Sequence, residues 1–343
     1  QDVGRGTFSQ RHAVLYDQVN EKRFVPLRHF QDQQGLFEIV DSFLSEYGVL
    51  GFEYGYSQVD PKTLVLWEGQ FGDFANNAQT IIDQFITTGE RKWLRMSGLT
   101  LLLPHGHEGQ GPEHTSSRLE RFLQMCAEDN IQVANCTSPA NYFHILRRQM
   151  MRDFRKPLVL MTPKSTLRHK ANTSPLADFV NGSTFHRVIS NHLSDDEYKN
   201  VNRIIFCSGK IYFELQDHIN ELQLKNVYII RLEQLYPFPY EALKEGIKKF
   251  NHCEMIWCQE EPQNMGAWEF IEKRLKSVLD LVGAKNELHF IGRRAAASPA
   301  TGVFDRHLAN QKNIIRLATE ANVDEIEKEK SGVSLVKYKL PIE

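Results

Sequence analysis

The stretch LTLLLPHGHEGQGPEHTSSRLERFLQ, residues 99–124, contains the pattern that decides the fold. An apolar run ends at Pro104, the next ten residues hold three histidines, three glycines and two glutamates, and an amphipathic pattern then begins. Strand, glycine-rich polar loop and helix, in that order, is how α/β proteins hold a ligand at the end of a sheet. The sequence therefore predicts a parallel sheet with a binding loop at residues 105–114.

The same alternation of strand and helix patterns extends along the whole chain. In the first half, strands are predicted within residues 47–57, 63–70, 99–104, 131–136 and 156–163, and helices within 75–89, 117–130 and 139–151. In the second half, strands are predicted within 203–209, 227–239, 254–262 and 287–292, and helices within 210–222, 240–250, 267–279 and 306–320. Such alternation is typical of parallel sheets that helices cover on both faces.

The fold class is therefore α/β, with two successive open-sheet domains. Turn formers and charges dominate from Lys164 to about Asn202, which indicates a surface connection between the two. We expect a first domain at residues 1–190, with the connecting segment from about 164, and a smaller second domain at 203–343.

Composition excludes several classes of protein. The 343 residues carry a formal net charge of −2, without the basic stripe of a nucleic-acid binder. No window approaches the roughly 18 apolar residues of a membrane span. The five cysteines are dispersed and form no C-x-x-C pair, so neither a zinc site nor a disulfide framework is indicated. The chain begins with Gln1 rather than Met and shows no signal peptide, so we expect it to be a piece of a longer protein.

Several strings together resemble the thiamine-diphosphate-dependent 2-oxoglutarate dehydrogenases, the decarboxylating first component of the 2-oxoglutarate dehydrogenase complex. They are DVGRGTFSQRH, LSEYGVLGFEYGYS, LWEGQFGDFANNAQ, LLPHGHEGQGPEHTSSRLERFLQMC, LRRQ, RKPLVLMTPKS, CSGK, EQLYPFP and WCQEEPQNMGAW. The resemblance spans nearly the whole chain and implies two parts of such an enzyme. These are the transketolase-like pyrimidine-binding domain and the transketolase-like C-terminal domain.

The resemblance implies half an active site. The family's diphosphate-binding domain should precede Gln1, and the chain has no G-D-G string followed by an Asn, the usual Mg²⁺-diphosphate signature. Thiamine diphosphate is therefore the expected cofactor, with Mg²⁺ bound by the full-length enzyme but not by this fragment. We expect the fragment alone to be inactive.

As the resemblance implies, the whole enzyme would decarboxylate 2-oxoglutarate in the citric acid cycle and transfer the succinyl group to a lipoyl domain. It would be a homodimer, bind the dihydrolipoyl succinyltransferase of the complex, and occupy a bacterial cytoplasm or a mitochondrial matrix. Two alternatives stay open. The 2-oxoadipate dehydrogenases share most of these strings, and a non-catalytic dimerisation or docking module would keep the fold without the chemistry.

Thiamine catalysis needs a protein carboxyl that shares a proton with a nitrogen of the cofactor's pyrimidine ring, and burial suits that carboxyl by raising its pKa. The family carries this glutamate in an S-E-x-G-like string, which here is Ser45-Glu46-Tyr47-Gly48. Glu46 is therefore the predicted catalytic and cofactor-binding acid. Glu53, within an apolar-aromatic run, is the second candidate.

An aromatic face is needed for the pyrimidine ring to stack on. Phe71 and Phe74 lie between a predicted strand and a predicted helix, and the resemblance assigns the stacking to Phe71. Phe74 is a cofactor-binding candidate that we expect to pack in the core instead. Gln70 is a further candidate for a hydrogen bond to the cofactor.

The three histidines of the loop could suggest a metal. The H-x-H spacing of His105 and His107 would place two ligands on one face of a strand, but no compelling spacing specifies a third, and we predict no metal site. In the family the histidine of the G-P-E-H string, here His114, faces the reacting carbon of the cofactor. A place at a helix start would favour its neutral form. His105 is the second catalytic candidate, as a substrate or shape residue, and His107 is expected to be an exposed loop residue.

Two further strings have ordinary structural readings. We expect WCQEEPQNMGAW to make an interdomain or subunit contact. The basic string RKPLVLMTPKSTLRHK, residues 155–170, which includes Lys164, is interpreted as a solvated face rather than a ligand site.

Overall fold

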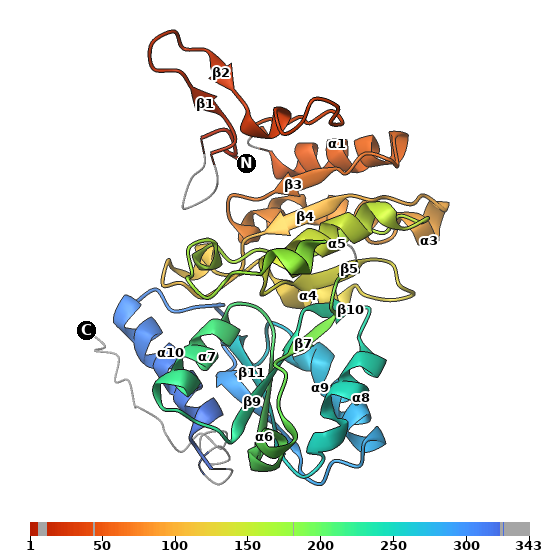
Figure 1. The fold of residues 1–343 in the computed structure, drawn as a ribbon. Coiled ribbons are helices and arrows are strands. Elements are labelled where there is room, and N and C mark those ends of the chain that lie inside the picture. The colour runs from red at the N-terminus through yellow and green to blue at the C-terminus, as the bar shows by residue number, and fades with distance from the viewer. Residues whose placement is uncertain (6–11, 44, 181, 323–324, 326–343) are drawn as a thin grey trace, which may run out of the picture.

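The computed structural model describes residues 1–5, 12–43, 45–180, 182–322 and 325. Two five-stranded sheets follow each other along the chain and lie one below the other in Figure 1. The first has the order β10-β5-β6-β4-β3, and only β10 runs antiparallel to its neighbour. Its strands are β3 (Leu66–Glu68), β4 (Thr100–Leu103), β5 (Gln132–Asn135), β6 (Leu158–Met161) and β10 (Gln234–Tyr236).

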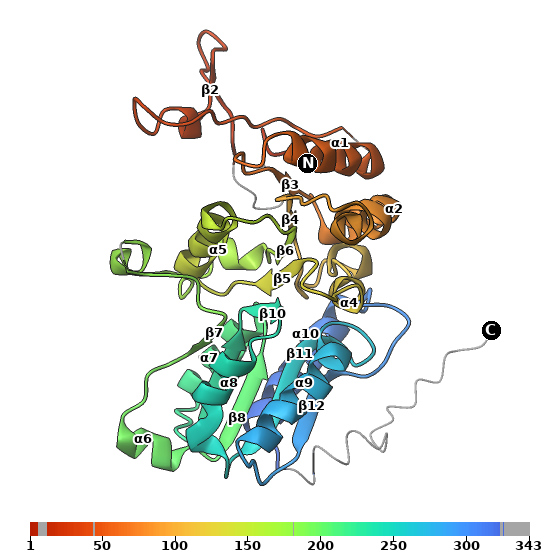
Figure 2. The ribbon, with the colours of Figure 1, turned by 90° about the vertical axis from the view of Figure 1, so that its right-hand side faces the viewer.

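Helices cover both faces of this sheet, as the apolar strands predict. Figure 2 shows α5 (Pro139–Met151) on one side and α2 (Gln79–Ile81) and α4 (Leu119–Gln124) on the other. A 3₁₀ segment (Gly72–Ala78) precedes α2, a π-helical turn (Ile82–Ile86) follows it, and α3 (Gly89–Trp93) comes next. Side chains of β4 alternate between two cores, with Leu101 and Leu103 in one and Leu102 in the other.

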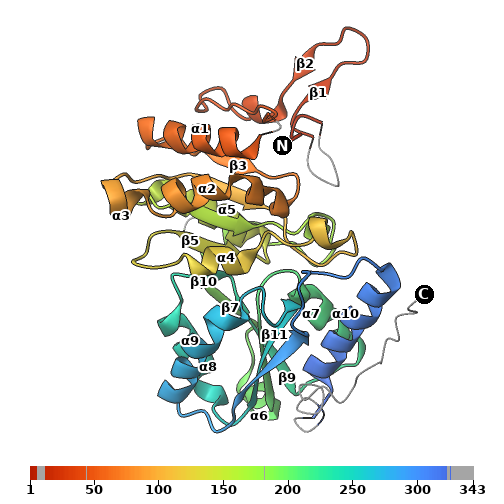
Figure 3. The same ribbon diagram turned by 180° about the vertical axis from the view of Figure 1, so that it is seen from behind.

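The second sheet has the order β12-β11-β8-β9-β7, with β7 antiparallel at its edge. Its strands are β7 (Val188–Ser190), β8 (Arg203–Cys207), β9 (Val227–Leu232), β11 (Glu254–Pro262) and β12 (Leu288–Arg293). Figure 3 shows α7 (Ile211–Glu221) and α10 (Phe304–Thr319) on one face, and α8 (Tyr240–Ile247) and α9 (Trp268–Leu281) on the other. The prediction of two α/β sheets is confirmed.

One stretch predicted as a single strand and turn serves both sheets. Residues 227–232 form β9 in the second sheet, and residues 234–236 form β10 in the first. Glu233 lies between them, fully buried, and accepts hydrogen bonds from the Thr137 amide (2.8 Å), the Thr137 hydroxyl and the Asn141 side chain (2.9 Å). Burial raises the pKa of this carboxyl, and the charge of Arg231 opposes that effect.

Residues 47–57, predicted as a strand, instead lie within α1 (Glu46–Val59), so that prediction is wrong. Tyr, Val and Phe favour strands as residue types. The buried residues of α1, however, are Leu50, Tyr54 and Ser57, spaced four and three apart as on one helix face. Packing of this face against residues 72–81 outweighs the local preference.

The connecting segment from Lys164 to Asn202 contains more structure than predicted. Two 3₁₀ turns (Ser165–Leu167 and Leu176–Phe179) are followed by β7 and by α6 (Asp195–Asn200). Since β7 pairs with β9, the second sheet takes a strand from ahead of residue 203. We therefore propose the division into two domains that the sequence predicts, with β7 assigned to the second domain.

An N-terminal arm extends away from the sheets in Figure 1. It holds the short pair β1 (Leu15–Tyr16) and β2 (Arg23–Phe24) and a 3₁₀ turn (Pro26–Arg28). Large apolar side chains stand exposed along this arm and on α1, at Val19, Phe30, Leu36, Val40, Phe43, Phe52 and Val59. Within the described residues, no helix is long and apolar enough to span a membrane.

The position of Glu233 yields a test of how the sheets are joined. Glu233→Ala leaves the Thr137 and Asn141 donors buried without an acceptor, so the free energy of unfolding should fall by about 3 kcal/mol. Urea denaturation measures it. Glu245→Ala, at an exposed position of α8, is the matched control and should change stability by less than about 0.5 kcal/mol. Equal stability of the two variants would show that Glu233 does not fasten the junction.

Candidate functional site

A cavity of about 180 Å³ opens where three neighbouring parallel strands end. Phe71 follows β3, the loop from Pro104 to His114 follows β4, and Lys164 and Ser165 follow β6. Ligands of open α/β sheets bind at this edge. The cavity is lined by Phe71, Pro104, His105, Gly106, Glu108, Gln110, His114, Lys164 and Ser165.

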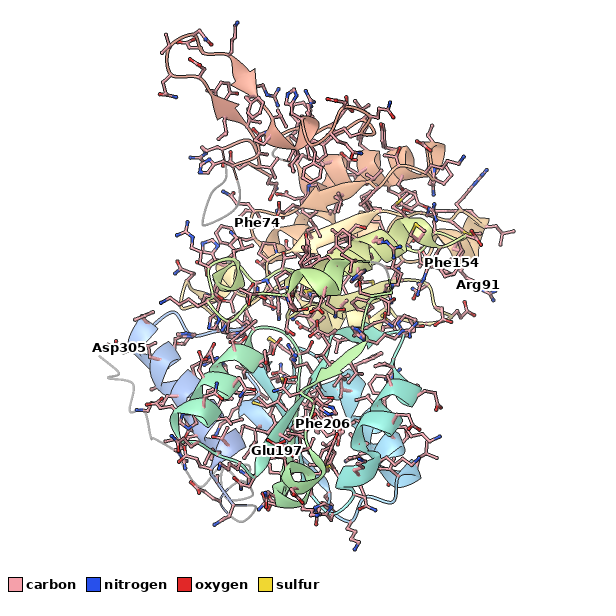
Figure 4. All side chains as sticks on the ribbon, viewed as in Figure 1. Phe74, Arg91, Phe154, Glu197, Phe206 and Asp305 are labelled. Atoms are coloured by element: carbon pink, nitrogen blue, oxygen red, sulfur yellow. The ribbon has the colours of Figure 1, made fainter. Side chains whose placement is uncertain are left out.

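Phe71 is the aromatic centre of the cavity. Its ring lies 4.0 Å from the ring of His114, centroid to centroid, at an interplanar angle of 33°. The Phe74 ring meets it edge-on at 5.4 Å. Phe74 itself does not line the cavity, and Figure 4 shows it on the same side of the molecule as Asp305 at the start of α10.

His114 faces the cavity from a 3₁₀ turn (Pro112–His114). Its Nδ1 is buried and has no hydrogen-bond partner among the described residues. Other buried atoms share this property, among them His107 Nδ1, so the place of His114 in the cavity against Phe71 is what distinguishes it. The helix α4 begins five residues later, at Leu119, so the expected place at a helix start is wrong.

His105 also lines the cavity, but neighbouring groups use both of its nitrogens. Nε2 lies 2.7 Å from the carboxylate of Glu261 on β11, and the Ser117 amide donates to Nδ1 at 3.1 Å. Nδ1 is therefore an acceptor, and the proton of the neutral ring is on Nε2. Burial opposes a charge on His105, but the hydrogen bond and charge of Glu261 outweigh it and raise its pKa.

The same contact affects Glu261. Burial disfavours its charged form, yet the hydrogen bond and charge of His105 lower the pKa of Glu261 to about 2. The second domain thus places an ionised carboxylate directly beneath the cavity. With Ser117 on the other nitrogen, this fits a shape role for His105 better than that of a proton donor.

His107 is buried, only 2% exposed, so its expected place on an exposed loop is wrong. Its Nε2 lies 2.9 Å from the carbonyl oxygen of Pro299 in the second domain, and burial lowers its pKa to about 3. The three histidines are thus directed to three different neighbours. No group of three metal-ligating side chains occurs in the described part of the chain.

Glu46 begins α1 and lies beside the cavity rather than on its wall. Its carboxylate accepts hydrogen bonds from the side chains of Gln1 (2.5 Å) and Asn77 (3.3 Å). The Gln1 side-chain oxygen in turn accepts the backbone amide of Gln70, at 2.9 Å. Glu46 is therefore connected, through one side chain, to the residue that precedes Phe71.

The other acid, Glu53, lies seven residues further along α1 and is half buried. Burial raises its pKa. It does not line the cavity. Of the two acids, Glu46 is therefore the better candidate, because hydrogen bonds through Gln1 link it to Gln70, the neighbour of Phe71.

The sequence did not predict one residue that lines the cavity, Lys164, or one that supports it from behind, Glu261. Lys164 was interpreted as part of a solvated face, but it lines the cavity and its ammonium group donates to the Gln70 carbonyl oxygen at 2.5 Å. Its place directly after the proline that ends a predicted strand could have identified it. Glu261 lies in the WCQEEPQNMGAW string, for which only a contact was expected, and no local pattern points to His105.

Comparisons with known proteins place these features in a family. The transketolase pyrimidine-binding domain matches residues 1–170, and the 2-oxoglutarate dehydrogenase C-terminal domain matches residues 173–319. Proteins named 2-oxoglutarate dehydrogenase E1 component from Brucella ovis, Brucella canis and Brucella abortus (strain S19) are each 58% identical over 318 residues. The matches cover 90% of this chain and 32% of each relative, so the chain spans about a third of their length.

Proposed function

The chain belongs to the 2-oxoglutarate dehydrogenase E1 family, and on that premise we propose that it is part of an enzyme that decarboxylates 2-oxoglutarate. The succinyl group would pass to a lipoyl domain of the dihydrolipoyl succinyltransferase, within the citric acid cycle. The observation that carries the proposal is the pairing of Phe71 with His114 at the carboxyl ends of β3 and β4.

The pyrimidine-binding domain implies thiamine diphosphate as the cofactor. The residues present fit one half of it: an aromatic ring, an imidazole nitrogen without a partner, and a carboxylate on the adjoining helix. A volume of about 180 Å³ is below the roughly 300 Å³ at which ordinary ligand pockets begin. We therefore propose that the diphosphate and Mg²⁺ are held by another domain.

Each residue has a definite task in this proposal. Phe71 packs against the pyrimidine ring, and Glu46 holds a proton at a carboxylate oxygen for sharing with a ring nitrogen. His114 Nδ1 donates or accepts a proton beside the substrate oxygens. His105 keeps the strand end in shape. When bound, the cofactor would supply a nucleophilic carbon and an electron sink for decarboxylation.

The exposed apolar residues of the arm and of α1 support a homodimer. Exposed large apolar side chains that gather on one part of a protein often lie at a protein interface. Val19, Leu36 and Phe43 are each more than four-fifths exposed, and Phe52 extends the surface onto α1, whose first residue is Glu46. We propose that a second copy covers this surface and brings its diphosphate-binding domain to the cavity.

The remaining parts of the proposal follow the sequence. A bacterial cytoplasm or a mitochondrial matrix is the proposed compartment, and the five cysteines are all free, as a reducing compartment requires. A preference for 2-oxoadipate is the alternative substrate. Turnover of the two oxo acids by the complete enzyme decides between them. The catalytic pairing of Phe71 and His114 argues against a docking module.

Residues 1–343 alone should be inactive. The cavity provides contacts for half a cofactor, so calorimetry with thiamine diphosphate and Mg²⁺ should show no tight binding. Submicromolar affinity, or decarboxylation of 2-oxoglutarate by this stretch alone, would contradict the proposed division of the site.

Glu46→Gln in the complete enzyme keeps the shape of the side chain but cannot hold the shared proton. Turnover should fall by roughly 10²-fold or more, the range for lost acid–base assistance, while the thermal midpoint is little changed. Glu53→Gln is the matched control on the same helix. Near-normal turnover of Glu46→Gln with loss in Glu53→Gln would exchange the two assignments.

His114→Ala in the complete enzyme removes the imidazole without touching the diphosphate. Oxo-acid turnover or acyl transfer should fall by roughly 10²–10⁴-fold, as for a removed acid–base group. Affinity for thiamine diphosphate should stay within a few-fold. His107→Ala should lower the stability of the protein more than its turnover, because the His107 side chain contacts the Pro299 carbonyl oxygen and not the cavity. Equal loss of turnover in both variants, or stoichiometric zinc in the wild-type protein, would overturn the role of His114.

A further inference from the structure

Glu261 is a residue of the second domain that reaches the cavity loop of the first. It lies on β11, is buried, and its carboxylate lies 2.7 Å from Nε2 of His105. Gly266 packs closely against it, because a Cβ atom at residue 266 would approach the Cβ and Cδ atoms of Glu261 to 2.9 Å. This packing restricts the orientation of the carboxylate.

The carboxylate of Glu261 determines which nitrogen of His105 carries the proton. An ionised carboxylate can only accept hydrogen bonds, so Nε2 must be the donor. Nδ1 is then the acceptor of the neutral ring, and it receives the Ser117 amide at 3.1 Å. The Ser117 hydroxyl lies 3.2 Å from the same nitrogen. If Nδ1 carried the proton instead, the ring N–H and the Ser117 amide would face each other as two donors.

Ser117 and Thr115 determine where His114 lies. The Thr115 carbonyl oxygen accepts the Gly106 amide at 2.9 Å, while Ser117 is held by the ring of His105. Two residues at the start of the loop thus hold two residues at its end. Since His114 directly precedes Thr115, its direction depends on these hydrogen bonds.

The other aromatic side chain of the cavity, Phe71, is held independently of the His105 ring. The amide of Gly72, the next residue, donates to the Pro104 carbonyl oxygen at 3.1 Å. This is a bond between backbone atoms, and the His105 side chain takes no part in it. A disturbance of the His105 ring should therefore move His114 and leave Phe71 in place.

We propose that Glu261 is a positioning residue: by fixing the proton of His105 on Nε2, it keeps Ser117 in place and directs His114 into the cavity. The inference rests on the proposed function, since it takes His114 as the acid–base group. It gives the second domain a part in the reaction that is exerted through hydrogen bonds, although Glu261 itself does not line the cavity.

Glu261→Gln in the complete enzyme tests the proposal. The amide has nearly the same shape but can donate as well as accept, so it also permits the tautomer with the proton on Nδ1. For 2-oxoglutarate, kcat should fall roughly 10- to 100-fold, as for a small displacement of a catalytic group. KM, the affinity for thiamine diphosphate and the thermal midpoint should be little changed, because Phe71 keeps its place. Glu287→Gln, the same substitution at an exposed position before β12, is the matched control and should change none of these values.

Double-mutant cycles distinguish positioning from a general loss of structure. In the His114→Ala background the group to be positioned is absent, so addition of Glu261→Gln should lower kcat by less than about threefold. In the His105→Asn background the amide oxygen takes the place of Nδ1 and accepts the Ser117 amide without help from Glu261. Addition of Glu261→Gln should there also lower kcat by less than about threefold.

The outcomes separate this inference from the proposed function. Unchanged kcat of Glu261→Gln, or losses that multiply in either background, overturn the inference. A rise in KM or a loss of cofactor affinity in Glu261→Gln also overturns it, because Glu261 would then support the site as a whole. If His114→Ala alone keeps normal turnover, or the wild-type enzyme has no thiamine-dependent decarboxylation, the proposed function fails, and the inference with it.

Discussion

The buried carboxylate of Glu233 is the constraint on which the arrangement of the two sheets depends. The chain leaves the second sheet at Leu232 and enters the first at Gln234, so the residue between them is surrounded by both. Its oxygens accept the hydrogen bonds of Thr137 and Asn141, just beyond β5. A buried carboxylate without such donors would be very costly, so these hydrogen bonds stabilise the crossing between the sheets. One apolar core then extends without interruption through both domains.

With the sheets fixed in this way, the second domain shapes the binding loop of the first. Glu261 holds His105, the Pro299 carbonyl oxygen meets His107, and the Gly266 amide donates to Glu120 on α4. These contacts flank the loop on both sides. Gly109, with φ +75°, lies so close to Phe304 that a Cβ atom would approach it to 2.7 Å. The conformation of the loop thus depends on contacts from the second domain and not on its own sequence alone.

Beneath the loop lies a buried group of charges that the cavity does not use directly. Lys210 pairs with Glu260 at 2.5 Å and with Glu214 at 2.6 Å, and its side chain packs against Gly106. Burial raises the pKa of Glu260 to about 7, against the charge of Lys210. Removal of one member would leave the other buried without a partner, which costs far more than the pair gains. Lys210 thus supports the cavity wall from behind at Gly106, which its side chain contacts.

The sequence by itself determined the elements that depend on neighbouring residues. The apolar run of 99–104, the polar loop and the helix pattern after it predicted β4, the cavity loop and α4, since periodicity is a local property. Phe71 and His114 were identified from their strings, and both line the cavity. Features that depend on contacts between residues far apart in the chain could be decided only by the tertiary structure. Packing made residues 47–57 a helix, a loop of the second domain contacts the buried His107, and Lys164 lies at the cavity wall beyond β6. Each of these outcomes is set by contacts that no local pattern records.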